Sequence, residues 1–263
     1  MRRAAVASLL VLAAAAPPQT PATTAPPVRP PVIHAADIAE QLAMLAFDGN
    51  PMWAIPVRDA LSRWVGPMRL FVFGRKEDRA DAQAALRALA RPTGLKLRLV
   101  LEQDVARDPP NAFIVADENL PAAFRGPLRG MLRNAFLGDE ETVNEFIVTV
   151  IDRTLCWALP VWGDAGRTVL KAAVIGIDIT QPTPEASACA LHGLGAALGL
   201  MGPGAFLPAS AFAPGTATRL SREDDRMLRV LYSRALHPGM RREEVLSAAQ
   251  KALAFRPVAK KPQ

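Results

Sequence analysis

Apolar positions along the chain follow the period of a strand in some segments and that of a helix in others. Leucine occupies every second position from 95 to 101, with Lys96 and Arg98 between the first three, which predicts a half-buried strand. The segment 185–200 is apolar almost all round, which predicts a helix buried at the centre of a domain. Strands are also expected at 68–73, 111–116, 146–150, 154–161 and 169–179, and helices at 36–47, 82–90, 126–136, 221–235 and 241–253.

Local signals refine several of these boundaries. Ser221 followed by Asp224 is a capping pattern that starts a helix. The charged segment 75–81 is interpreted as a turn, and a short helical piece is expected to end at Trp64. The order of helix, strand, helix, several strands, central helix and terminal helices predicts a single α+β domain, with a mixed sheet, a buried central helix and C-terminal helices.

The two ends of the chain have a different character from its middle. Arg2 and Arg3 precede a thirteen-residue apolar run, 4–16, and small residues then lead into Pro17, which is typical of a secretory signal peptide cleaved near 14–16. An uncleaved N-terminal anchor is the alternative. We expect a signal peptide at 1–16, a Pro/Thr/Ala-rich linker at 17–34, the domain at 35–255 and a disordered tail at 256–263. These features predict a periplasmic or secreted bacterial protein without stable membrane insertion once the signal is removed.

Charge argues against one class of partner. The net charge of +6 in 263 residues falls to +4 when Arg2 and Arg3 leave with the signal (6 − 2 = 4). The remaining arginines are scattered singly along the sequence among acidic residues. A nucleic-acid-binding protein would show a basic stripe, often with aromatic partners, so no nucleic-acid partner is expected.

Cys156 and Cys189 are the only two cysteines, and an even pair in an oxidising compartment predicts a disulfide. Two buried free thiols are the alternative. A third possibility is a nucleophilic pair, because His192 follows Cys189 by three residues on one helix face.

The predicted central helix can be compared with the H-E-x-x-H pattern of zinc proteases, in which two histidines hold the metal and the glutamate is the general base. His192 matches the first ligand, but Gly193 stands at the base position and Ala196 at the second ligand. The two other histidines, His34 and His237, lie far away in the sequence. We therefore assign no catalytic residue, no metal ligand and no cofactor. A core histidine is the plain interpretation of His192.

Four segments resemble the uncharacterised proteobacterial family known as domain of unknown function 2927. They are ADIAEQLAMLAF, LSRWVGPMRLFVFG, CALHGLGAALGL and LSREDDRMLRVLYSRALHPGMRREEV, which cover about 36–253 in this order. The resemblance implies an exported, zincin-like or metzincin-like domain whose H-E-x-x-H helix is degenerate. Relatives typically carry Glu or Gln where this chain has His192, Gly193 and Ala196, so no active site is carried over.

The leading hypothesis is a non-catalytic, metalloprotease-like domain, a pseudoenzyme that binds a protein or a component of the cell envelope. The alternative is an active envelope hydrolase, dependent on a metal or on Cys and His, with His192 and Cys189 as candidate site residues. A structural module without a small-molecule site is the third hypothesis.

Overall fold

The structure is a computed structural model that describes residues 33–180, 183–204, 206–207, 209–213 and 217–254. The expected signal peptide, nearly all of the expected linker and the expected tail lie outside the described residues. The described residues form one compact unit. Among the helices described, none combines the length and the apolar character needed to cross a bilayer.

Helices and strands are interleaved along this unit. In chain order they are α1 (Ala35–Phe47), η1 (Pro51–Trp53), β1 (Arg63–Trp64), β2 (Met68–Phe73), α2 (Lys76–Thr93), β3 (Leu97–Leu99), η2 (Glu102–Asp104), β4 (Ala112–Asp117), α3 (Leu120–Arg125), α4 (Arg129–Ala135), α5 (Glu140–Phe146), η3 (Ile147–Ile151), β5 (Cys156–Trp162), β6 (Val169–Asp178), α6 (Thr183–Ala197), α7 (Arg222–Leu231) and α8 (Arg242–Ala254).

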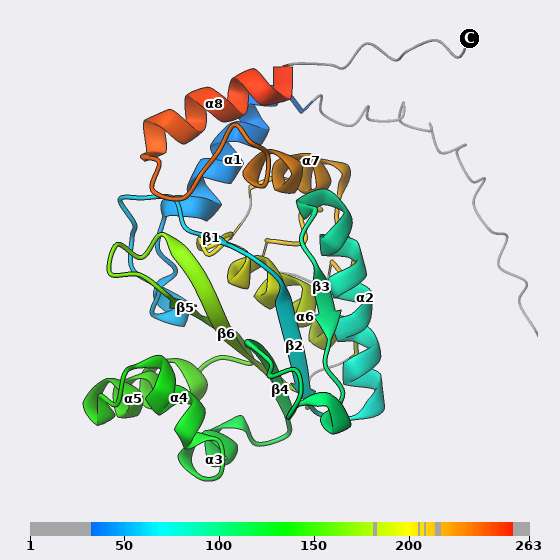
Figure 1. The fold of residues 1–263 in the computed structure, drawn as a ribbon, viewed down its shortest axis with the longest axis vertical. Coiled ribbons are helices and arrows are strands. Elements are labelled where there is room, and N and C mark those ends of the chain that lie inside the picture. Colours follow the sequence, from blue (N-terminus) through cyan, green and yellow to red (C-terminus); the bar gives the residue numbers. More distant parts are fainter. Residues whose placement is uncertain (1–32, 181–182, 205, 208, 214–216, 255–263) are drawn as a thin grey trace, which may run out of the picture. The chain divides into compact units, whose positions relative to one another are not determined.

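A six-stranded sheet lies at the centre of the unit (Figure 1). β1, β6, β4, β2 and β3 follow one another with parallel pairing, whereas β5 runs antiparallel to β6. β5 follows η3 and turns back into β6 through a tight hairpin, which explains why this one pair is antiparallel. The predicted mixed sheet with surrounding helices is therefore confirmed, and it is mainly parallel.

The two faces of the sheet carry different helices, as the neighbours Ile175 and Gly176 on β6 show. Successive residues of a strand point to opposite faces. On one face, Gly193 of α6 lies directly against the Ile175 side chain. On the other, the Trp157 indole fills the space over Gly176 and contacts rings from α3 and α5. The sheet thus separates α6 from the helices α3 to α5 (Figure 1).

The remaining helices pack around α6 and against one another. α2 packs on α6 and α7, and α1 packs on α8 and α7. α6 is buried on nearly every side, as its all-round apolar sequence predicts. Gly195 of this helix allows the Phe212 ring to pack closely, because a Cβ at position 195 would lie 2.3 Å from that ring.

One predicted element is wrong because a short apolar run has no unique period. The segment 146–150 was expected to be extended, but it forms the end of α5 and the π-helical turn η3. Ile147, Val150 and Ile151 are buried there with helical spacing, and Thr149 Oγ1 donates to the Glu145 carbonyl one turn back, at 2.7 Å. The helix expected at 126–136 is confirmed in a shorter form, because α4 covers Arg129–Ala135, and a separate helix, α3, ends at Arg125 before Gly126.

Two further corrections come from polar contacts. The charged segment expected to be a turn is the beginning of α2, because Asp78 accepts a hydrogen bond from the Arg75 backbone N–H at 2.7 Å and caps the helix. The short helical piece expected to end at Trp64 is not helical: its last two residues form strand β1, which pairs with the start of β6, and the residues before them are irregular.

Candidate functional site

His192 lies near the middle of α6, and its ring is shielded by the N-terminal part of the chain. The Trp53 ring packs against the imidazole with centroids 4.9 Å apart. The residue as a whole is half-buried, but its Nε2 is enclosed and has no hydrogen-bond partner among the described residues. Burial lowers the pKa of His192 from 6.5 to about 4, so the imidazole is neutral at pH 7.

Trp53 is held over α6 by a small closed loop. Asn50 and Ile55 exchange two backbone hydrogen bonds, of 2.8 and 2.9 Å, which brings the ends of this loop together. Gly49 allows the two ends of the loop to approach each other closely, because a Cβ at this position would lie 2.5 Å from the Ile55 carbonyl oxygen. The Trp53 indole N–H donates to the Cys156 carbonyl at 2.8 Å. The indole therefore contacts both β5 and the His192 face of α6.

Cys189 is joined to Cys156 by a disulfide, with the two sulfurs 2.08 Å apart. The bond links α6 to the beginning of β5, and the predicted pairing is confirmed. A sulfur held in a disulfide is not a thiolate nucleophile. The structure therefore places Cys189 and His192 on the same helix, as expected, but without a free thiol between them.

Gly193 and Ala196 occupy the positions of the general base and of the second zinc ligand, and both are packed. A Cβ at Gly193 would lie 2.6 Å from Cγ2 of Ile175, so the core leaves no space there for a larger side chain. Ala196 is fully buried. The positions that would have to carry a carboxylate and an imidazole are thus part of the packing between α6 and the rest of the core.

The residues around His192 do not fit a hydrolytic zinc ion. Such an ion takes three protein ligands and keeps one open position. His34 lies at the start of α1 and His237 in the turn after α7. In the described part of the chain, no three His, Cys, Asp or Glu side chains come together in a way that could hold a metal ion.

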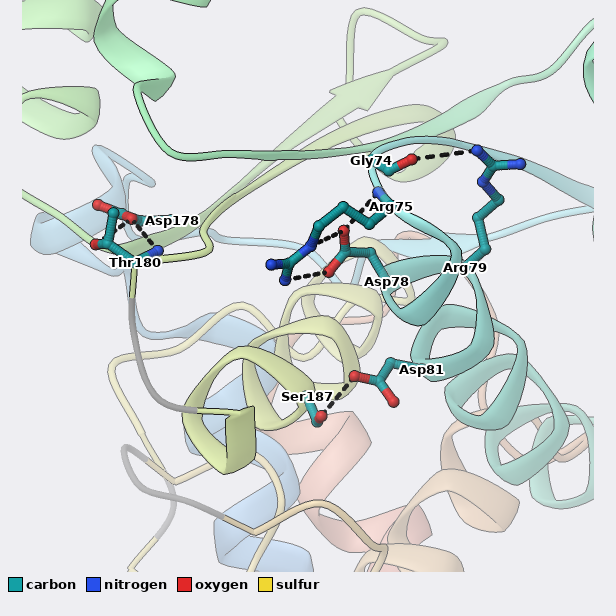
Figure 2. Close-up of polar contacts among 8 residues, drawn as sticks. All are labelled: Gly74, Arg75, Asp78, Arg79, Asp81, Asp178, Thr180 and Ser187. Carbon is teal, nitrogen blue, oxygen red and sulfur yellow. Dashed lines mark hydrogen bonds and ion pairs between the residues drawn. The ribbon is translucent and has the colours of Figure 1, made fainter.

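A second set of polar side chains lies where β6 ends and α6 begins (Figure 2). Ser187 on α6 donates from Oγ to Asp81 Oδ2 on α2, at 2.6 Å. Thr180 donates from both its backbone N–H and its Oγ1 to Asp178 Oδ1, at 2.8 and 2.6 Å. The first contact ties α2 to α6, and the second fixes the chain as it leaves the sheet.

The beginning of α2 is secured in the same region (Figure 2). The Arg75 guanidinium donates to both carboxylate oxygens of Asp78, at 3.2 and 3.3 Å, and Arg79 donates to the Gly74 carbonyl at 3.2 Å. These groups satisfy one another, so their arrangement serves to position the two helices. No local pattern in the sequence predicts the pairing of Asp81 with Ser187 or of Trp53 with His192, since both pairs join segments that are far apart along the chain.

A family model described as "Protein of unknown function (DUF2927)" matches residues 36–251, which confirms the family expected from the four sequence segments. No curated protein matches the chain.

Proposed function

We propose that this chain, which belongs to the DUF2927 family of proteins of unknown function, is an exported, non-catalytic, metalloprotease-like domain that binds a protein or a component of the cell envelope. The observation that carries the proposal is the packing of Gly193 against Ile175 on the sheet. A general base at position 193 would have to displace the core of the domain.

The metalloprotease-like part of the proposal rests on α6 and its surroundings. This helix packs on one face of a mixed sheet and carries His192 at the first ligand position of the zinc-protease pattern. The next functional positions, Gly193 and Ala196, carry no donor atoms in their side chains. In this proposal α6 corresponds to the metal-binding helix of the pattern, with one imidazole and with packed positions beside it.

Export is supported by the basic and apolar beginning of the sequence and by the disulfide between Cys156 and Cys189. Disulfides persist in oxidising compartments such as the bacterial periplasm. Both observations point to a periplasmic or secreted location. In that setting, a domain without its own hydrolytic centre contributes by binding.

Metal analysis of the purified protein tests the proposal. We expect much less than one zinc per chain, the same content in His192→Ala, and no hydrolysis of casein or of peptidoglycan fragments. His237→Ala is the matched control, because it removes an exposed histidine far along the sequence. One zinc per chain that is lost in His192→Ala and kept in His237→Ala would overturn the non-catalytic assignment. Hydrolysis abolished by His192→Ala or Cys189→Ser would favour the hydrolase alternative.

A further inference from the structure

A hollow of about 700 Å³ lies between α2 and the segment that leads into α7. Four arginines line it, two from α2, one from the segment before α7 and one from the first position of α7, and we call it the arginine groove: Arg87, Arg91, Arg219 and Arg222. All four are exposed. Its two walls are more than a hundred residues apart in the sequence and are brought together by the packing of α2 on α7. Folding therefore brings together a cluster of basic side chains that is not apparent in the sequence.

Most of this positive charge is unpaired. Arg91 approaches Asp225 at 3.3 Å, and Asp225 also binds Arg229 at 2.7 Å. For Arg87, Arg219 and Arg222, the described residues supply no hydrogen bond or ion pair. The groove therefore holds one carboxylate, already shared between two arginines, against four guanidinium groups.

The stability of the fold does not explain this arrangement. Arg222 is the first residue of α7, and Arg219 lies just before it. The beginning of a helix carries a partial positive charge, so cations there are unfavourable. Three guanidinium groups without partners in one hollow also repel one another. An anionic ligand would remove both costs.

The walls of the groove narrow the choice of anion. None of the large apolar side chains exposed in the described part of the chain lines it, so nothing there would insert into a bilayer. No aromatic ring lines it either, which argues against stacked nucleic-acid bases. The chain's own C-terminal residues, with Arg256, Lys260 and Lys261, would be repelled. A concave basic surface with these walls suits a narrow acidic chain.

The spacing of the arginines fits an extended peptide. Arg87 and Arg91 are four residues apart on α2, a rise of about 6 Å. Alternate residues of an extended chain point the same way and are separated by about 6.6 Å. Ala84 and Ala88 also line the groove from α2, next to Arg87 and Arg91. Their small side chains leave room for the backbone of a bound peptide to approach the helix. The guanidinium fork matches a carboxylate in two hydrogen bonds.

We propose that the arginine groove binds an extended acidic segment of a partner protein, with carboxylates at alternate positions. This inference rests on the proposed binding role and names the chemistry of the partner. It requires no metal and no reaction at α6.

Fluorescence anisotropy with the full, disulfide-intact chain tests it. The probe is a labelled peptide of alternating Glu and Ala, and its matched control has Gln in place of Glu. We expect the Glu peptide to bind, the Gln peptide not to bind, and the affinity to fall as salt is raised, because screening weakens exposed charge pairs. The double variant Arg87→Glu/Arg222→Glu should weaken binding about tenfold or more, since each change replaces attraction by repulsion.

Arg153→Glu is the matched control variant. Arg153 is exposed, follows η3 and lies outside the groove, so its reversal changes the net charge by −2, as each substitution of the double variant does, and should leave the peptide affinity unchanged. Thermal unfolding of each variant verifies that the fold is kept. Equal affinity of the double variant and the unsubstituted protein, or no binding of the Glu peptide, would overturn the proposal. Binding to phosphatidylglycerol vesicles that requires Arg87 and Arg222, without peptide binding, would assign the groove to a membrane surface instead.

The two proposals fail separately. Stoichiometric zinc at His192 would end the non-catalytic assignment and leave the peptide result standing. Absence of peptide binding would end the groove proposal and leave the metal analysis unaffected.

Discussion

The rings of Trp53 and His192 lie against each other, with centroids 4.9 Å apart and planes inclined by 48°. Through this contact, the loop that follows α1 covers the face of α6 on which a zinc protease would hold its metal. The Nε2 atom of the covered imidazole is enclosed and has no hydrogen-bond partner in the described part of the chain. The contact therefore has measurable consequences for stability.

The first prediction concerns pH. The pKa of His192 is about 4 in the folded chain, against 6.5 ordinarily, because burial disfavours the imidazolium. Between these values the unfolded chain binds the proton and the folded chain does not, so the free energy of unfolding rises with pH over this window and stops rising above it. The contribution lost on acidification is about 3 kcal/mol. Urea unfolding at several pH values measures it.

The controls for this measurement are two glutamine variants. His192→Gln should have a flatter dependence of stability on pH between about 4 and 6.5 than the unsubstituted protein. His237→Gln, which changes an exposed histidine, should keep the original dependence. Identical curves for His192→Gln and the unsubstituted protein would contradict the burial of the imidazole.

The second prediction concerns Gly193. Within a helix, Gly→Ala ordinarily stabilises by up to about 1 kcal/mol. At Gly193 the new methyl would lie 2.6 Å from Ile175 Cγ2, so we expect a loss of about 1–3 kcal/mol instead. Gly130 on α4 is the control, because no atom lies within 4 Å of a Cβ built there. Chemical denaturation of the two alanine variants should give opposite signs, and a gain at both sites would show that α6 is not packed this closely.

The third prediction concerns the disulfide. Cys156 and Cys189 are separated by 33 positions, and closing a loop of that length is worth about 3–4 kcal/mol in the chain-entropy model. The double variant Cys156→Ser/Cys189→Ser should lose about this much stability in urea. Mild reduction of the unsubstituted protein should lower its stability to a similar degree. A double variant as stable as the oxidised protein would show that the bond contributes nothing to the fold.

The fourth prediction concerns Asp224, which is almost completely buried at the start of α7. Its Oδ1 accepts from Ser210 Oγ at 2.6 Å, and its Oδ2 accepts from the backbone N–H groups of Ala211 and Ser221, both at 2.9 Å. In Asp224→Asn an amide donor replaces one acceptor, so we expect a loss of about 2–3 kcal/mol.

The neighbouring residue supplies the comparison for Asp224. Asp225→Asn removes ion pairs to Arg91 and Arg229 that lie at the surface, and should cost less than about 1 kcal/mol. Thermal or urea unfolding of the two variants measures the difference. Equal losses would contradict the role assigned to the buried carboxylate.

Several features of the fold could be predicted from the sequence because short stretches of chain encode them. The start of α7 follows from Ser221 and Asp224, which bond to each other's backbone N–H groups at 3.0 and 2.9 Å as the capping pattern requires. Strand β6 and the burial of α6 follow from the placement of apolar residues. The family follows from four ordered segments, and the disulfide from a single pair of cysteines.

The sequence alone thus determined local periodicity, one helix cap and the cysteine pairing. It also determined that position 193 carries no carboxylate and position 196 no imidazole. Only the tertiary structure decided that Trp53 covers His192, that Asp81 binds Ser187, and that arginines of α2 and α7 line one groove. Caps and amphipathic faces depend on residues within about one helical turn, so their signals are local. Contacts across the sheet and between distant helices depend on how the whole core closes, which no short stretch of the chain specifies.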